Sequence, residues 1–258
     1  MKWLLIACGV VLSLTGYMAC MRSKVQRENP VIQRSLVKWE STGDSASSTR
    51  LGKDSQGHIT SMENNAELNR FQFSTDSILL TEYSKTNNRI VYAFKGRLDS
   101  AGRLTEGTAI VGYADHGTDT VLHRFEYDDQ GYLVKEYRDY GKAGIYIIIY
   151  QYEAGDAIRI STWYNNELYN TKELEYYTGK NNLTGLEDFK FRKNINHMVG
   201  NVSKHLVKKI TSVAGNGKLN YSFNFEYETD DEGLPLKLIT RKGKKVSGVT
   251  TYFYAAKV

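Results

Sequence analysis

Apolar and polar residues alternate along most of the chain beyond residue 50, in short runs with a period of two. In the stretch 222–227, aromatic residues occupy every second position and polar residues occupy the positions between them. A period of two places the two sets on opposite faces of a β-strand, so that one face is buried and the other faces water. Runs of this kind, together with continuous apolar runs, occupy Ile78–Ser84, Asn88–Lys95, Gly107–Tyr113, Leu122–Tyr127, Gly144–Tyr152, Ala157–Tyr164, Glu167–Tyr177, Leu206–Val213, Leu219–Tyr227 and Val249–Tyr254.

Clusters of Asp, Asn and Gly separate these runs, and such clusters close tight hairpins. Few windows show the period of a helix. The pattern predicts an all-β fold: a single large antiparallel meander of β-hairpins that forms a curved or partly closed, half-barrel-like sheet, with few or no helices apart from a signal peptide. The segment Thr184–His205 breaks this rhythm and could hold a short helix or an ordered crossing loop.

An Asp-x-x-Gly unit recurs between the runs and raises the question of whether its carboxylates are chemical or structural. In a hairpin turn the aspartate can accept hydrogen bonds from backbone N–H groups two or three residues later, and the glycine adopts a positive φ without a Cβ clash. A calcium loop or a carboxylate pair, the alternative, would need more oxygens or a partnered acid and base at one place. We therefore interpret the unit as a structural turn. The turn residues are Asp54, Gly57, Asp99, Gly102, Asp128, Gly131, Asp230 and Gly233.

The N-terminal nineteen residues have the pattern of a secretory signal peptide, with a basic residue at Lys2, an apolar stretch, and small or weakly polar residues before Cys20. The apolar stretch Trp3–Leu14 is too short to span a bilayer at about 1.5 Å per residue. Tyr17–Cys20 resembles the lipobox of bacterial lipoproteins, and the other cysteine, Cys8, has almost no hydrophobic region ahead of it. We predict a lipid on Cys20; an ordinary signal peptide with an incidental cysteine is the alternative.

The rest of the chain divides into a tether and one domain. Residues 20–50 are polar, contain Pro30 and offer little apolar surface to bury, so they indicate a lipid-anchored tether. Val31–Trp39 could add an edge strand within this tether. Because no shift in composition divides the chain beyond residue 50, the predicted organisation is a signal peptide over 1–19, the tether, and one antiparallel β domain over 51–258.

Composition narrows the class of protein and of partner. With 41% apolar and 24% charged residues, the chain is neither disordered nor a polytopic helical membrane protein. The 19 tyrosines and only 2 prolines favour sheet. The net charge of +5 is small and dispersed, so nucleic acid is not expected as a partner. We expect a monomer without a cofactor.

Patterns of catalytic and metal-binding residues are missing from the sequence. No two histidines have the i, i+4 spacing of a zinc helix, so we predict no metal site. Ser203–His205 joins a serine, a lysine and a histidine, but neighbours in an extended chain point to opposite faces. No Gly-x-Ser-x-Gly motif is present, and we predict no catalytic residue. The histidines are His58, His116, His123, His197 and His205.

Three aromatic residues around an Asn-Asn turn, Trp163, Tyr164 and Tyr169, are candidate ligand contacts. Exposed aromatic rings near a loop can stack on sugars or contact a protein partner. The alternative is that alternation directs one of the first two residues to the core while the other covers a strand edge.

Asn196–Thr211 and Phe225–Gly243 resemble the Bacteroidota lipoproteins of the domain-of-unknown-function family DUF4595. The repeated turn unit is also similar to the YD or RHS hairpin repeat. The resemblance implies a long, curved antiparallel sheet in an envelope lipoprotein, and it implies no established activity. The positions that match the family are Gly200, Ser203, Lys204, Leu206, Lys208, Ile210, Gly233 and Pro235.

The resemblance also bears on location. Bacteroidota lipoproteins on the cell surface usually carry acidic residues just after the cysteine, whereas this chain has Arg22, Lys24 and Arg27. We therefore predict an exported protein anchored by its lipid to the outer membrane and facing the periplasm.

Three classes of function remain open at this point. The favoured prediction is a non-enzymatic envelope lipoprotein that acts as a binding or interaction module for an envelope partner or a glycan. The alternative is a carrier of a lipid or other amphiphile on the concave face of the sheet, by analogy of shape. A hydrolase of envelope polymers is a second alternative. A carrier needs an open apolar concavity, a binding module needs aromatic and polar loops at one rim, and an enzyme needs a cleft with close titratable groups.

Overall fold

The alternating runs form one antiparallel sheet in the computed structural model, which describes residues 34–43, 46–55, 58–113, 117–185 and 198–255. β-Branched and aromatic residues favour the pleated strands, and Asn, Asp and Gly favour the turns between them. Sixteen strands lie within these residues. They are β1 (Leu36–Gly43), β2 (Ser47–Lys53), β3 (Ile59–Glu63), β4 (Glu67–Phe73), β5 (Ser77–Ser84), β6 (Ile90–Leu98), β7 (Leu104–Tyr113), β8 (Gly117–Tyr127), β9 (Leu133–Asp139), β10 (Ile145–Glu153), β11 (Asp156–Tyr164), β12 (Glu167–Asn181), β13 (His205–Ala214), β14 (Leu219–Thr229), β15 (Pro235–Lys242) and β16 (Lys245–Tyr254).

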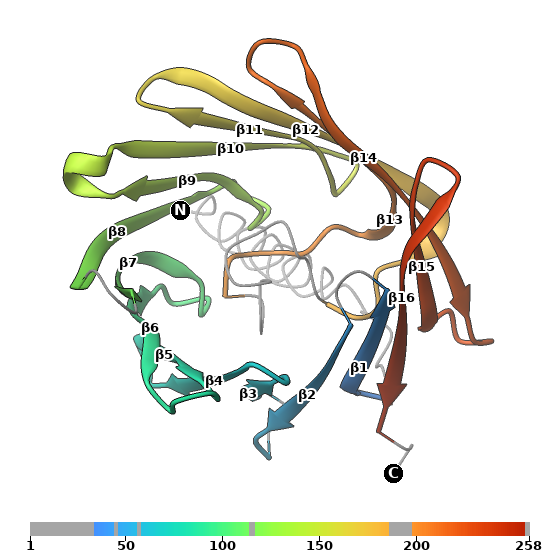
Figure 1. Ribbon diagram of the computed structural model, residues 1–258, viewed down its shortest axis with the longest axis horizontal. Helices are drawn as coiled ribbons and strands as arrows, with labels where there is room; N and C mark the ends of the chain where they lie inside the picture. The colour runs from blue at the N-terminus through green and yellow to red at the C-terminus, as the bar shows by residue number, and fades with distance from the viewer. Residues whose placement is uncertain (1–33, 44–45, 56–57, 114–116, 186–197, 256–258) are drawn as a thin grey trace, which may run out of the picture. The chain divides into compact units, whose positions relative to one another are not determined.

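The sheet closes on itself as a barrel. Each strand pairs with its neighbour in sequence, and β1 pairs antiparallel with β16, which completes the ring (Figure 1). The predicted all-β antiparallel meander is confirmed, but closure is complete rather than partial. The physical reason is that a closed ring leaves no strand edge unpaired, and closure requires both end strands.

The strand that closes the ring, β1, lies within the stretch 20–50 that the sequence indicated as a tether. The sequence placed only an edge strand there. In the structure Trp39 of β1 pairs with Tyr252 of β16 on one side and with Thr49 of β2 on the other. The first strand of the barrel therefore belongs to that stretch, and it pairs with β16 on one side and β2 on the other.

Helical structure is almost absent from the described residues, as predicted. They contain one 3₁₀ turn, Gly141–Ala143, between β9 and β10. Within the same residues no helix is both long and apolar enough to cross a membrane.

One side of the interior is a packed core. The ring of Phe94, only 1% exposed, lies against the backbone of Gly96 and Gly107. A Cβ atom at Gly107 would lie 2.2 Å from Cζ of Phe94, so the missing side chains make room for the ring. Ile78 and Leu80 of β5 complete this part of the core, each 1% exposed.

Residues 198–204, which precede β13, lie inside the ring of strands (Figure 1). The backbone of these residues forms hydrogen bonds with successive turns at one end of the barrel. The Met198 carbonyl accepts from Leu104 N at 2.7 Å, and Asn201 N donates to the Gly131 carbonyl at 2.9 Å. Lys204 N then donates to the Gly155 carbonyl at 3.0 Å. Of the two predictions for Thr184–His205, residues 198–204 form the crossing loop, and 186–197 lie outside the described residues.

The outer face of the barrel carries charges that pair across neighbouring strands. Lys209 Nζ lies 2.9 Å from Glu175 Oε1 between β13 and β12, and the Glu175 side chain is 55% exposed. These pairs follow from alternation, because the outward residues of adjacent strands stand opposite one another. Further pairs of this kind are Arg97–Glu106, Lys135–Glu126, Arg159–Glu173, Lys237–Glu228 and Arg241–Glu226.

Candidate functional site

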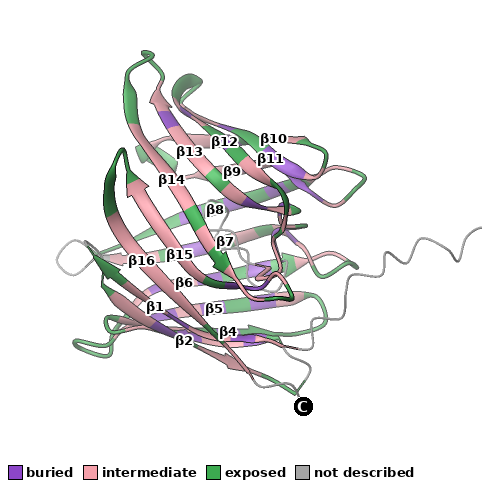
Figure 2. Ribbon diagram, turned by 90° about the vertical axis from the view of Figure 1, so that its right-hand side faces the viewer, coloured by how far each residue is buried: buried purple, intermediate pink, exposed green. Residues whose placement is uncertain are grey.

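The barrel interior is filled on one side and hollow on the other. Strands β14 and β16 contain no buried residue, whereas buried positions recur along β5, β6 and β8 (Figure 2). A cavity of about 660 Å³ explains the difference, because it lies against the inward side chains of β13–β16, β1 and β2. Inward residues there stay half exposed because they face this space rather than one another.

Aromatic rings form the middle of the cavity wall. Phe223, Phe225 and Tyr227 line it from β14, where the period of two directs all three to the same face. Trp39 and Tyr252, cross-strand partners on β1 and β16, line it from the adjoining wall. Rings of this size offer large apolar contact areas to a ligand.

Hydroxyl groups line the end of the cavity near the β1–β2 and β15–β16 turns. Ser41 Oγ and Thr250 Oγ1 lie 2.9 Å apart, and Ser247 Oγ donates to the Thr240 carbonyl at 3.1 Å. Lys242, the last residue of β15, also lines this end. The cavity therefore combines an apolar middle with a polar mouth.

A histidine held by an aspartate lines the opposite end, where the crossing segment joins β13. His205 Nδ1 lies 2.7 Å from Asp156 Oδ2, and His205 N donates to Asp156 Oδ1 at 2.9 Å. Ser203 Oγ accepts from Ala157 N at 3.2 Å and lies 3.1 Å from the Tyr176 hydroxyl. These bonds fix the end of the crossing segment to β11 and β12.

A separate charged cluster lies in the packed half of the barrel. The fully buried Glu136 carboxylate accepts two hydrogen bonds from Arg138, at 2.6 and 2.9 Å, and one from the Tyr150 hydroxyl at 3.4 Å. His123 Nδ1 lies 3.5 Å from Glu136. Burial alone would raise the pKa of Glu136, but the charge of Arg138 and the hydrogen bonds from His123 and Arg138 hold that pKa below its ordinary value. Each oxygen of the buried Glu136 carboxylate therefore has a donor within the packed half of the barrel.

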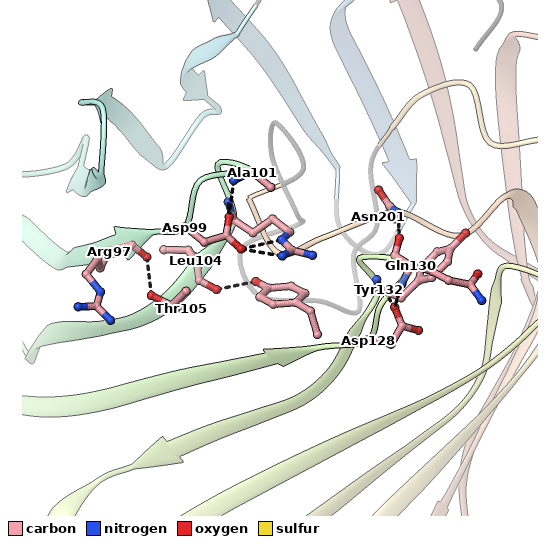
Figure 3. A network of polar contacts seen from close by, with 11 residues as sticks. Arg97, Asp99, Ala101, Leu104, Thr105, Asp128, Gln130, Tyr132 and Asn201 are labelled. Atoms are coloured by element: carbon pink, nitrogen blue, oxygen red, sulfur yellow. Dashed lines mark hydrogen bonds and ion pairs between the residues drawn. The ribbon is translucent and has the colours of Figure 1, made fainter. Parts of the chain in front are cut away.

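The repeated aspartates bind the backbone of their own turns. Asp99 Oδ1 accepts from Ala101 N and Arg103 N, both at 2.9 Å, so its donors lie two and four residues later (Figure 3). The glycines have positive φ, for example +85° at Gly131. Asp128 and Asp230 repeat this geometry with Gln130 and Tyr132, and with Glu232 and Leu234.

The strand order places these turns at one end of the barrel, on the even-to-odd connections of the meander. Asp54 accepts from His58 N at 2.9 Å, and Gly57 lies outside the described residues. Gly102 and Gly233 have φ values of +75° and +81°. No group of three or more His, Cys, Asp or Glu residues in the described ranges could hold a metal ion.

The three candidate aromatic residues lie away from the cavity. Tyr164 belongs to a tyrosine cluster in which its ring centroid lies 4.7 Å from that of Tyr146, and Tyr169 lies 6.3 Å from Tyr146. Tyr169 is 58% exposed. Trp163 is half-buried, and its indole Nε1 has no hydrogen-bond partner within the described part of the chain. Their contact with a ligand stays a prediction.

The remaining predicted positions are scattered. Cys20, His116 and His197 lie outside the described residues, so lipidation stays a prediction. His123 packs between Phe94 and Phe125, with ring centroids 5.6 and 6.1 Å away.

Sequence reasoning missed the residues that line the cavity. Trp39 lay in the predicted tether, and Asp156 and His205 are 49 residues apart. The alternation over residues 222–227 did predict that Phe223, Phe225 and Tyr227 share one face of a strand. It could not show that the described residues leave a cavity opposite them.

Comparison with known proteins identifies relatives in structure only. No protein-family model and no curated protein sequence matches the chain, so the resemblance to DUF4595 lipoproteins stays a prediction. A porin-like protein from Bacteroides uniformis aligns with a TM-score of 0.63 and 12% identity, over 85% of this chain and 96% of that one. A porin-like protein from Bacteroides vulgatus aligns with a TM-score of 0.60 and 14% identity, over 86% and 98%. The chain shares the barrel fold of these proteins.

Proposed function

We propose that the protein is a non-enzymatic binding protein of the cell envelope that holds a small amphiphile in the cavity of its barrel. The observation that carries this proposal is the cavity of about 660 Å³ with aromatic rings in its middle and polar groups at both ends. Its volume falls in the range of roughly 300–1,000 Å³ typical of small-molecule sites. The lining suits a ligand that has an apolar body and at least one hydrogen-bonding group.

The charged outer face supports binding over passage through a membrane. A barrel that spans a bilayer carries an outward apolar band about 25 Å tall, and a lipid-facing charge near its middle costs about 2–4 kcal/mol. Here ion pairs lie within the strands: Lys209 and Glu175 are direct cross-strand partners, and Arg241 and Glu226 are diagonal neighbours on β15 and β14. These ion pairs suit contact with water on their part of the outer face, although Ile110, Leu122 and Ile149 are exposed on other parts of the strands. In this proposal a lipid on Cys20 supplies the attachment to the outer membrane.

A second candidate function is contact with a glycan or an envelope partner through the tyrosine cluster Tyr140, Tyr146, Tyr164 and Tyr169. The rings of Tyr140 and Tyr146 lie 5.6 Å apart, and Tyr169 remains mostly exposed. Exposed rings in a group offer a rigid surface for stacking. This function does not need the cavity, so variants of the cavity wall separate the two candidates.

The test is equilibrium binding of N-phenyl-1-naphthylamine, a fluorescent neutral amphiphile, to the full chain without detergent. We expect saturable binding at one site. Thr240→Trp places a large ring in the cavity, so it should weaken binding at least about tenfold. Thr251→Trp is the matched control: Thr251 is outward, between the partners Glu40 and Lys237, and the same substitution there should leave binding unchanged.

Two results would overturn the proposal. The first is the absence of saturable probe binding by the folded chain. The second is equal weakening by Thr240→Trp and Thr251→Trp, which would place the probe outside the cavity.

A further inference from the structure

Asp156 and His205 form a hydrogen-bonded pair at the cavity wall. Asp156 is 7% exposed and is not among the described residues that line the space, whereas His205 is. The carboxylate uses one oxygen for the His205 backbone N–H and the other for Nδ1, at 2.9 and 2.7 Å. These two hydrogen bonds to Asp156 hold the imidazole ring of His205 in one orientation. Within the described part of the chain the ring makes no other hydrogen bond, which leaves Nε2 for a ligand.

The Asp156 carboxylate also determines whether Nε2 of His205 accepts or donates a hydrogen bond. An ionised carboxylate only accepts hydrogen bonds, so the proton of a neutral imidazole resides on Nδ1. Nε2 then carries a lone pair and accepts. A group that binds Nε2 of the neutral ring must therefore be a donor.

We propose that the ligand bears a hydroxyl or amine group that donates a hydrogen bond to Nε2 of His205, with its apolar body along the aromatic wall of β14. The inference rests on the proposed function and adds the chemical class of the ligand. A carboxylate in the same place would meet the lone pair of Nε2 and the negative charge of Asp156 behind the ring. A fatty alcohol or amine therefore fits this end better than a fatty acid.

A second Asp–His pair in the chain has the same hydrogen bonds and serves as a comparison. In the β2–β3 turn, Asp54 binds His58 in the same two ways, with Oδ1 to the backbone N–H at 2.9 Å and Oδ2 to Nδ1 at 3.0 Å. The His58 side chain is 50% exposed, and His58 does not line the cavity. The same pair of residues thus occurs once in a local turn and once at the cavity, across 49 residues of sequence.

The test compares octan-1-ol with octanoate as competitors of N-phenyl-1-naphthylamine on the full chain. The two probes share a chain length and differ in their heads, because octanol carries a neutral hydroxyl donor and octanoate an anionic carboxylate without a donor. We expect octanol to compete better than octanoate. His205→Asn keeps an amide N–H near the position of Nδ1 and removes Nε2, so it should lower the affinity for octanol about tenfold and leave octanoate nearly unchanged.

Asp156→Asn instead changes which nitrogen of the His205 ring carries the proton. The amide can donate to Nδ1, which moves the imidazole proton to Nε2 and turns it into a donor. This variant should shift the octanol-to-octanoate preference about tenfold toward octanoate. Asp54→Asn is the matched control and should leave the preference unchanged.

The outcomes separate the two proposals. A wild-type chain that does not bind the fluorescent probe overturns the proposed function itself. A chain that binds the probe in the cavity, but whose octanol-to-octanoate ratio is the same in wild type, His205→Asn and Asp156→Asn, overturns the assignment of His205 alone. Thermal unfolding of each variant shows whether it is folded, and the ratio is read on folded protein.

Discussion

At the scale of single residues, the buried carboxylate of Glu136 contributes most clearly to stability. Its two bonds to Arg138 leave neither oxygen without a donor. Glu136→Leu leaves the partly exposed Arg138 without its partner, and we expect the free energy of unfolding to fall by about 3 kcal/mol. Urea unfolding measures the change. The control is Glu126→Leu, which breaks the exposed pair with Lys135 and should cost less than about 1 kcal/mol; equal losses would contradict the assignment.

The repeated turns offer a second comparison between neighbours. Asp128 accepts two backbone N–H groups at 3.0 and 2.9 Å. The adjacent Asp129 is exposed and accepts none from the described residues. We expect Asp128→Ala to lower the free energy of unfolding by about 1–2 kcal/mol, and Asp129→Ala to change it by less than about 0.5 kcal/mol. If the two variants are equally stable in urea, the carboxylate does not hold the turn.

Residue chemistry was predictable from sequence where it is local. The turn role of Asp128 follows from its neighbours Gly131 and Tyr132, all within one hairpin. The pairing of Asp156 with His205 does not, because 49 residues separate them and only the crossing segment brings them together. The reading of Ser203–His205 as chemically silent by alternation also overlooked that His205 could find a partner on another strand.

At the scale of elements, closure depends on the contact of β1 with β16. Ser41 and Thr250 are cross-strand partners with hydroxyl oxygens 2.9 Å apart. We expect Ser41→Cys with Thr250→Cys, in a chain whose native cysteines are replaced by serine, to form an intramolecular disulfide on mild oxidation. Ser41→Cys with Thr251→Cys is the control and should stay reduced, because position 251 faces the other side of the sheet. Electrophoretic mobility without reductant distinguishes the two, and cross-linking only between chains would contradict closure.

Period two predicted the strands and their hairpins but could not predict closure. Alternation tells which residues share a face, and tight turns tell which neighbours pair. Neither connects Ser41 of β1 to its partner on β16, 209 residues later. The first strand was also hard to see, since LVKWESTG has few apolar residues and its inward Ser41 faces a cavity rather than a core.

At the scale of the whole barrel, polar and apolar side chains occur on both faces of the wall, since Leu79, Ile110 and Ile149 are exposed apolar residues of its strands. Its outer face carries paired charges, while its interior holds a packed core on one side and a cavity rich in aromatic and hydroxyl groups on the other. Composition alone did not reveal this, because a charged fraction of 24% fits many arrangements. The division between core and cavity arises only when the ring closes.

The most direct test of the central claim is native mass spectrometry of the full chain, with the predicted lipidation site removed by Cys20→Ser, purified without detergent. We predict one small amphiphile per chain. That molecule should be present in the Thr251→Trp control and lost from Thr240→Trp. A folded chain that carries no small molecule, or one that retains it equally in both variants, would contradict the claim that the barrel binds a ligand in its cavity.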